Sequence, residues 1–347
     1  MIGFICAAGL IVSRQVGPTV KWQFHTDGPI LSTPVVGSGR VILGSSDSFV
    51  YALAAATGDL IWKFETQGPV TGSAAVVDGV AYILSGDGRL YALDTDSGKM
   101  RWSFATGFER RFQAKHLHGQ MPAEQTIPDA WDFFLSTPAV ADGTVFFGSS
   151  DGNIYALNAQ DGHLRWKYRT GDVVHTTPLV ARGRVFVGSM DSRFYALDEK
   201  TGALKWMFQA GRDPNVHNKE GFQGSPTLDD GTLFVGCRDT HLYALDADTG
   251  AMRWSFSKGT GWISNRPLVA GDLVWAGTNP FRAINRSTGK LAIDTGRVGV
   301  FSNPAASGNV GFVGTLYGSV FAFDLKSGSV LWEFQTEART RLVEDPG

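Results

Sequence analysis

The side chains best suited to bind or transform a ligand gather in two stretches of this 347-residue chain. The stretch 107–133 holds two histidines, basic and acidic residues and a tryptophan, and the stretch 212–222 adds a histidine, a lysine and a glutamate. Imidazole, carboxylate and indole groups can move protons, hold metals or stack on planar ligands. The candidate ligand-binding residues in these stretches are His116, His118, Asp129, Trp131 and His217.

Five further candidates stand at or beside positions that are filled differently in each copy of a repeat. One such position is occupied in turn by Leu31, Thr71, Leu135, His175, Gln223, Ser264 and Phe301, and in one copy the usual Ser-Thr-Pro becomes Asn-Arg-Pro after a tryptophan. An arginine, several histidines and two tryptophans would suit a planar, anionic or sugar-like ligand. The remaining candidate ligand-binding residues are His175, Gln223, Trp262, Asn265 and Arg266.

A metal site would need these histidines to converge. The pair His116-x-His118 would point both rings to one side of an extended segment, and His175 or His217 would complete a set of nitrogen ligands. No acidic ligand stands at a spacing that places it beside them. We therefore expect no metal site.

Other catalytic signatures are weak. The two cysteines, Cys6 and Cys237, are too few for a disulfide framework or a cysteine-based zinc site. Residues 148–152 match Gly-x-Ser-x-Gly, but sister copies of the repeat hold the same place, so we interpret the match as a hairpin turn and not as a nucleophile elbow. The sequence offers no enzyme signature.

The elements that must position the candidates come from a repeat that fills nearly the whole chain. One unit reads as a hydrophobic strand, a Gly-Ser-x-Asp-Gly turn, Tyr-Ala-Leu-Asp, Thr-Gly and a strand with Trp-x-Phe. Most copies are 39 or 40 residues apart, and the two longer spacings contain 107–133 and 212–222. Because the tryptophan recurs in every copy, we expect it to be structural. Its positions are Trp22, Trp62, Trp102, Trp166, Trp206, Trp254 and Trp332, with Ile293 in the missing place.

Each repeat contains four short segments with the composition of strands, rich in β-branched and aromatic residues. Asp-Gly and Asp-Ser between them favour hairpin turns, and proline is tolerated where a strand begins. Four strands in ~40 residues is the size of a propeller blade. The sequence therefore predicts an all-β fold, a single β-propeller domain over 1–347, with both inserted loops on one face around the channel mouth.

The number of blades depends on the termini. Seven complete units are present, and residues 3–24 align loosely with 311–334. We expect the two termini to form an eighth four-stranded blade that closes the ring and removes its open sheet edges. Alternatively, the apolar residues 1–12 are a signal-like segment, although no Lys or Arg precedes them. That run is too short to span a bilayer, so we expect no transmembrane span.

The recurring Tyr-Ala-Leu-Asp-x-x-Thr-Gly-x-x-x-Trp resembles the repeat of the pyrroloquinoline-quinone-type propeller superfamily over almost the whole chain. In length the chain is most similar to small single-propeller bacterial proteins related to the outer-membrane barrel-assembly propeller lipoprotein (BamB-like). The resemblance implies eight blades and tryptophans docked between neighbouring blades. It also implies a periplasmic or cell-envelope location.

The superfamily also contains quinone-dependent dehydrogenases, which implies an alternative function. Those enzymes sandwich pyrroloquinoline quinone between a tryptophan and a disulfide of adjacent cysteines, with a bound calcium ion. Here the two cysteines lie far apart, although Trp262 or Trp131 could stack on a quinone and Arg266 could pair with its carboxylates. A quinone- or metal-dependent oxidoreductase acting on alcohols or sugars therefore stays the alternative, with pyrroloquinoline quinone and calcium as its cofactors.

The net charge of the chain narrows the classes of partner to expect. The formal net charge is -2 and the isoelectric point about 6.4, so nothing favours nucleic acid or an anionic membrane surface. We expect a non-catalytic binding or scaffold propeller that presents a polar, loop-built face to a protein partner or a small polar ligand at the channel mouth. A sugar binder that stacks its ligand on Trp131 and Trp262 is a smaller alternative.

Overall fold

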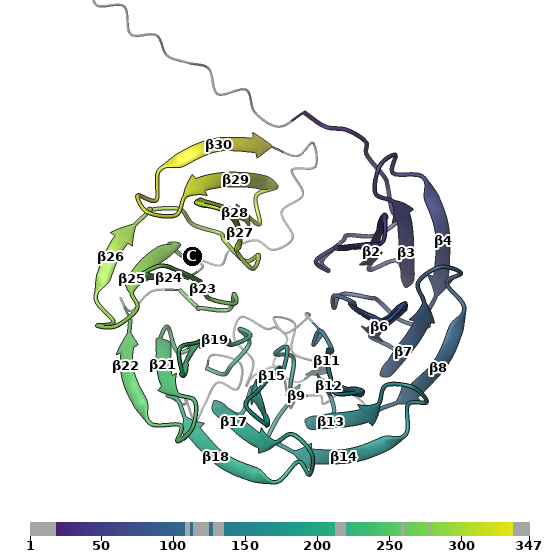
Figure 1. Cartoon of the computed structure of the whole chain (residues 1–347), viewed down its shortest axis with the longest axis horizontal. Helices are drawn as coiled ribbons and strands as arrows, with labels where there is room; N and C mark the ends of the chain where they lie inside the picture. The colour runs from purple at the N-terminus through teal and green to yellow at the C-terminus, as the bar shows by residue number, and fades with distance from the viewer. Residues whose placement is uncertain are drawn as a thin grey trace, which may run out of the picture.

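Seven antiparallel blades surround a central axis in the computed structural model, which describes residues 19–107, 112–113, 125–127, 135–211, 220–257, 261–277 and 279–335 (Figure 1). In each blade the four strands follow chain order, from the innermost strand beside the axis to the outermost strand at the rim. The predicted all-β propeller architecture is confirmed.

The strands of one blade are short and nearly equal in length to their counterparts in the others. Blade 1 comprises β1 (Val35–Gly37), β2 (Arg40–Gly44), β3 (Phe49–Ala54) and β4 (Leu60–Glu65). Blade 2 comprises β5 (Ala75–Val77), β6 (Val80–Ser85), β7 (Arg89–Asp94) and β8 (Met100–Ala105). Blade 3 comprises β11 (Ala139–Ala141), β12 (Thr144–Gly148), β13 (Asn153–Asn158) and β14 (Leu164–Arg169). Blade 4 comprises β15 (Leu179–Ala181), β16 (Arg184–Gly188), β17 (Arg193–Asp198) and β18 (Leu204–Gln209).

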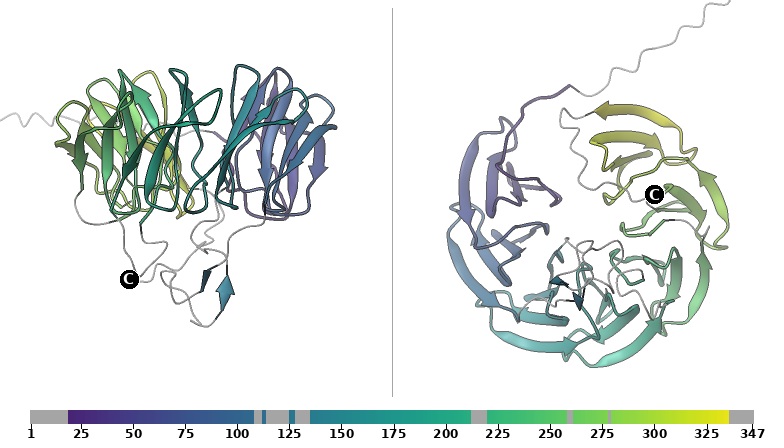
Figure 2. Two further views of the ribbon diagram at one scale, coloured as in Figure 1. Left: turned by 90° about the horizontal axis from the view of Figure 1, so that it is seen from below. Right: turned by 180° about the vertical axis from the view of Figure 1, so that it is seen from behind.

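The last three blades repeat the same pattern. Blade 5 comprises β19 (Thr227–Asp229), β20 (Thr232–Gly236), β21 (Leu242–Asp246) and β22 (Met252–Phe256). Blade 6 comprises β23 (Leu268–Ala270), β24 (Leu273–Ala276), β25 (Arg282–Asn285) and β26 (Leu291–Asp294). Blade 7 comprises β27 (Ala305–Ser307), β28 (Val310–Gly314), β29 (Ser319–Asp324) and β30 (Val330–Gln335). A separate hairpin pairs β9 (Phe112–Gln113) with β10 (Thr126–Ile127) and lies on one side of the ring (Figure 2).

The prediction of eight blades is wrong, because the structure shows seven. The error came from counting Trp22 as part of an eighth sheet. Trp22 docks on blade 1, with Nε1 3.1 Å from the Ala55 carbonyl oxygen, and Phe24 packs edge-on against Tyr51. Residues 19–34 nevertheless pair with no strand. The N-terminal segment carries the Trp-x-Phe signature, but the residues before Trp22 contain neither the Asp-Gly turn nor the Tyr-Ala-Leu-Asp segment of the repeat.

The hydrophobic core lies between neighbouring blades, and the repeated tryptophan is part of it. Trp166 on the outermost strand of blade 3 donates from Nε1 to the Glu199 carbonyl oxygen of blade 4 at 2.9 Å. Its ring lies directly on Gly202, which has a φ of +70° and leaves no room for a β-carbon. In blades 1 to 6 the equivalent turn glycine forms the docking place for the preceding tryptophan of the column, and the predicted structural role of these six tryptophans is confirmed.

The turn aspartate and the repeated tyrosine form a second contact that recurs from blade to blade. In blade 4 the Asp191 carboxylate accepts hydrogen bonds from the Tyr195 hydroxyl at 2.6 Å and from the Gly171 backbone N–H at 2.7 Å. Burial, followed by the hydrogen bond to Asp191, raises the pKa of Tyr195. Because Gly171 lies in the connection from blade 3, this aspartate links two blades.

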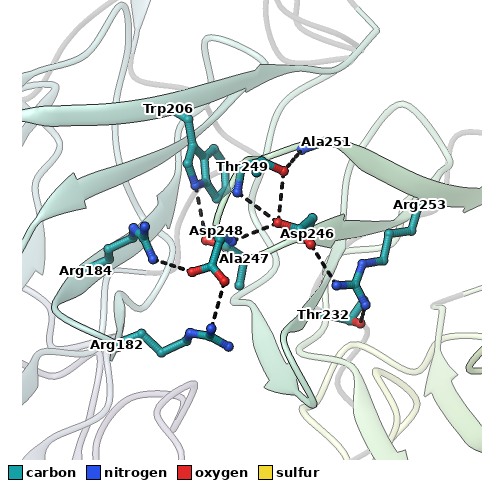
Figure 3. A network of polar contacts seen from close by, with 10 residues as sticks. All are labelled: Arg182, Arg184, Trp206, Thr232, Asp246, Ala247, Asp248, Thr249, Ala251 and Arg253. Atoms are coloured by element: carbon teal, nitrogen blue, oxygen red, sulfur yellow. Dashed lines mark hydrogen bonds and ion pairs between the residues drawn. The ribbon is translucent and has the colours of Figure 1, made fainter.

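Ion pairs join neighbouring blades away from the core. Asp248 of blade 5 accepts from Arg182 and Arg184 of blade 4, with both N–O distances at 2.7 Å (Figure 3). Beside it, Trp206 Nε1 donates to the Ala247 carbonyl oxygen at 3.2 Å. One short turn thus receives both the tryptophan and the arginines of the preceding blade.

Blade 6 compensates for its missing tryptophan. Ile293 stands in that column, and the space above Gly328 of blade 7 is filled by Ile293 together with the ring of Trp275. Trp275 lies on the second strand, is fully buried and stacks on Phe281. A large ring from another strand therefore replaces the repeated one.

Candidate functional site

A cavity of about 840 Å³ is bordered by the segments that lead into the innermost strands. The position that differs from copy to copy borders it in every blade, which confirms that these residues meet around one channel. They are Leu31, Thr71, Leu135, His175, Gln223, Ser264 and Phe301. Each of these residues precedes the innermost strand of its blade, so they mark one end of the channel. That the inserted stretches 107–133 and 212–222 gather at this end stays a prediction.

The channel wall combines hydroxyl and amide side chains with apolar ones and carries no formal charge. Among the described residues that border it, none is Asp, Glu, Lys or Arg. The residues two positions after the variable one link neighbouring blades. The Thr33 backbone N–H donates to Ser73 Oγ at 2.7 Å, and the Thr177 backbone N–H donates to Ser225 Oγ at 3.0 Å. A hydroxyl that accepts such a bond keeps a proton to donate. The wall can therefore hydrogen-bond a neutral polar group.

Asn265, a predicted ligand-binding residue, is fully buried. Its amide nitrogen donates to the Gly277 carbonyl oxygen at 3.0 Å and its amide oxygen accepts from the Gly277 N–H at 3.2 Å. Ser32 and Thr176 make the same paired contact with a glycine in blades 1 and 4. Asn265 thus holds the innermost strand of its blade to the next one, and a role in ligand binding stays a prediction.

Arg266 lies just before the innermost strand of blade 6 and contacts the blades on both sides of it. Its backbone N–H donates to Asn303 Oδ1 at 2.7 Å, and its Nε lies 3.3 Å from the Thr227 hydroxyl. The residue remains exposed, yet surrounding protein atoms desolvate the guanidinium and lower its pKa. It is not among the residues that border the cavity.

His175 is 7% exposed and borders the cavity. Its Nε2 lies 2.7 Å from the hydroxyl of Ser150, the middle residue of the Gly-x-Ser-x-Gly match. Ser150 belongs to the hairpin turn between β12 and β13, as the repeat predicts. The contact orients the imidazole, but a turn of this kind is not the strand-to-helix elbow that exposes a nucleophilic serine.

Gln223 and Trp262 both contact Arg238, which the sequence alone did not single out. Arg238 is 1% exposed; its Nε donates to Gln223 Oε1 at 3.0 Å, and its guanidinium carbon lies 4.5 Å from the centre of a Trp262 ring. Stacking of guanidinium on indole is favourable when both are desolvated. A sequence signal existed, because Arg238 and Ser150 occupy the same position of the hairpin turn, which varies from copy to copy.

The structure therefore brings His175, Gln223 and Trp262 to the blade 3–6 side of one face, together with Ser150 and Arg238. Five other predicted residues lie outside the described residues, and their part in a site stays a prediction. They are His116, His118, Asp129, Trp131 and His217.

The described residues on this face supply hydroxyl, amide, imidazole and guanidinium groups. No three His, Cys, Asp or Glu side chains gather there as a metal site would require. Cys237 is buried, and this burial raises the pKa of its thiol. Within the described ranges of the chain, no helix has the length and apolarity needed to cross a lipid bilayer.

Solved structures share this fold. BamB from Moraxella catarrhalis matches with a TM-score of 0.72 and 21% identity over 89% of this chain and 88% of that one. The computationally designed Ika8 protein matches with a TM-score of 0.69 and 16% identity over 90% and 89%. Quinohemoprotein alcohol dehydrogenase from Comamonas testosteroni matches with a TM-score of 0.67 and 17% identity over 89% of this chain but 67% of that one. At these identities the likeness shows the fold alone.

A comparison with curated proteins finds no match. A family model described as outer membrane protein assembly factor BamB, in contrast, matches residues 10–123, 120–219 and 215–345, which together cover nearly the whole chain. The repeat, the propeller architecture and this match agree. The chain belongs to the family of the outer membrane protein assembly factor BamB.

Proposed function

We propose that the protein is a non-catalytic binding or scaffold propeller of the bacterial cell envelope that receives a protein partner or a small polar ligand at its channel mouth. One contrast carries this proposal. Ser32 and Thr176 occupy a position that repeats from blade to blade and holds strands together, whereas the position just before it, which borders the mouth, varies among the blades. A rigid ring whose residues vary around one opening suits recognition.

The chemistry of the mouth supports binding of a polar group. Ser264 Oγ is buried beside the cavity and makes no hydrogen bond within the described residues. The neighbouring wall supplies hydroxyls without formal charge. A ligand or loop that offers neutral hydrogen-bonding groups would therefore provide partners for the hydroxyls of the mouth, and its desolvation would cost little free energy.

The family supports the location of the protein. BamB is described as an assembly factor for outer membrane proteins, and this chain has the same repeat and fold. We therefore propose a periplasmic or envelope-associated propeller that binds a protein partner. Cell fractionation tests the location, since recovery of the protein only with cytosolic markers would contradict it.

Site-specific photo-crosslinking in cells tests the binding face. A benzophenone amino acid at Thr71 or Gln223 reports on the mouth, whereas the same group at Lys200, in an exposed turn between the outer strands of blade 4, serves as the control. We expect a discrete adduct from the mouth positions and none from the control. Adducts of equal yield at all three positions, or none at the mouth, would contradict the proposal.

The alternative function is that of a quinone- or metal-dependent oxidoreductase, which the likeness to a quinohemoprotein alcohol dehydrogenase favours. One observation weighs against it. The Trp262 ring, one of the two candidate stacking surfaces, already carries the Arg238 guanidinium on one face. Titration with pyrroloquinoline quinone and calcium, read by absorbance and thermal shift, decides the matter, because a ligand specific for the folded state raises its apparent stability. No change in either signal would exclude the quinone version.

A further inference from the structure

The residues that border the channel include an apolar arc and a polar arc. In blades 7 and 1, which are neighbours around the ring, the variable position holds Phe301 and Leu31 (Figure 1). Two more apolar residues border the cavity there, Leu316 of the hairpin turn between β28 and β29 and Ile30 before β1. These four residues form the apolar arc.

The apolar arc keeps part of its surface in contact with solvent. Phe301, Leu31 and Leu316 are half-buried, and Ile30 is 41% exposed. Aromatic rings in the cores between blades, such as Phe146 of blade 3, are in contrast fully buried. Covering apolar surface that borders a cavity is favourable, because water is released from it. The apolar arc can therefore stabilise an apolar group of a ligand.

The polar arc spans blades 4 to 6, and blades 4 and 5 lie across the ring from blade 1 (Figure 1). Here the variable position holds His175, Gln223 and Ser264, and Ser225 also borders the cavity. The Ser264 Oγ atom is buried and makes no hydrogen bond within the part of the chain that the structure describes. Ser225 Oγ accepts a bond from the Thr177 N–H at 3.0 Å and keeps its own proton to donate. Two hydroxyls of this arc can therefore bond a ligand.

The rest of the wall restricts the charge and the size of a ligand. Blades 2 and 3 separate the two arcs, with Thr71 and Leu135 at the variable position. Because no Asp, Glu, Lys or Arg among the described residues borders the cavity, a charged ligand would lose its water without gaining an opposite charge. The cavity volume of about 840 Å³ lies within the range of small-molecule sites, roughly 300–1,000 Å³. The wall therefore favours a small, uncharged ligand with one apolar and one polar end.

We propose that the channel mouth binds a neutral amphiphile, which is an uncharged molecule with a ring or short alkyl chain at one end and hydroxyl or amide groups at the other. The apolar end lies against Phe301, Leu31 and Leu316, and the polar end bonds Ser264 and Ser225. A buried hydroxyl without a partner costs free energy, which a hydrogen bond from the ligand recovers. This inference rests on the proposed function of the mouth as a binding site, and it adds the chemical class of the ligand.

Isothermal titration calorimetry of the full chain at neutral pH with three matched probes tests this ligand class. Phenyl β-glucoside has both ends, methyl β-glucoside lacks the ring, and phenyl β-glucuronide carries a carboxylate in place of the hydroxymethyl group. We expect phenyl β-glucoside to bind with a dissociation constant of about 1 mM or tighter, and each of the other two probes to bind about tenfold or more weakly. No binding of phenyl β-glucoside, or equal affinities for all three probes, would overturn the proposal.

Substitutions in the apolar arc test where the ring of the probe lies. Phe301→Ala should weaken the binding of phenyl β-glucoside about fivefold or more, because it removes apolar surface from the cavity. Leu316→Ser tests the same arc if Phe301→Ala does not fold, which thermal unfolding reveals. Leu204→Ala, at an exposed position on the outermost strand of blade 4, is the control and should leave the affinity within about twofold of the wild type. Equal affinities for the Phe301, Leu316 and Leu204 variants would refute this placement.

Ser264→Ala separates binding from folding. The change removes a buried hydroxyl that has no partner within the described residues, so the thermal stability of the empty protein should not fall. Binding of phenyl β-glucoside should weaken about three- to tenfold, whereas the control Ser287→Ala, in an exposed turn of blade 6, should leave it unchanged. A loss of stability without a loss of affinity would overturn the proposal. Crosslinking of a partner protein at the mouth in cells does not depend on this ligand class, so the proposed function and this inference can fail separately.

Discussion

The docking of each tryptophan on a glycine of the next blade can be tested with two alanine substitutions in blade 4. Gly202 and Gly183 have φ values of +70° and +68°, so alanine meets the same left-handed backbone at both. That conformation costs about 1–2 kcal/mol. At Gly183 nothing lies within 4 Å of an added β-carbon, whereas at Gly202 the carbon would lie 2.7 Å from Trp166 ring atoms.

The difference between the two variants isolates the docking contact. Forcing an atom into a packed core costs about 1–3 kcal/mol, and a Trp166 displaced from Glu199 loses a hydrogen bond worth about 1 kcal/mol. We therefore expect Gly202→Ala to lower the free energy of unfolding by about 2–4 kcal/mol more than Gly183→Ala. Urea unfolding, followed by tryptophan fluorescence, measures this difference if the slope with denaturant is unchanged. Equal midpoints for the two variants would refute the docking argument.

Three further substitutions test other contacts. Ile293→Trp restores the repeated tryptophan, yet it should lower the stability by about 1–3 kcal/mol because Trp275 already fills that space; a gain in the urea midpoint would show otherwise. Asn265→Ala should cost about 2–4 kcal/mol by leaving buried backbone groups without partners, whereas Asn265→Ser should cost clearly less, because other blades use serine there. For Tyr51, burial and then the hydrogen bond from its hydroxyl to Asp47 raise the pKa to about 12, so the folded state disfavours the phenolate. Its contribution to stability should be complete below pH 10 and lost as the pH rises toward 12, and Tyr51→Phe should flatten that loss in alkaline unfolding curves.

The sequence predicted the candidate site only where residues depart from the repeat in a visible way. The variable position before each innermost strand led correctly to the channel, because a ring of similar blades brings equivalent positions to one axis. Asn265 attracted attention because other blades have serine or threonine at its position, yet it makes the same hydrogen bonds to a glycine as the residue it replaces. Arg238 was missed because its importance depends on Gln223 and Trp262, which reach it from other parts of the chain.

The sequence by itself determined the blade: turn glycines, tyrosine and tryptophan recur with one period, and the hydrogen bonds and docking contacts they make are local or reach only the next repeat. The tertiary structure decided what depends on distant partners. The number of blades was one such property, because Trp22 docks on blade 1 without its segment pairing into a sheet.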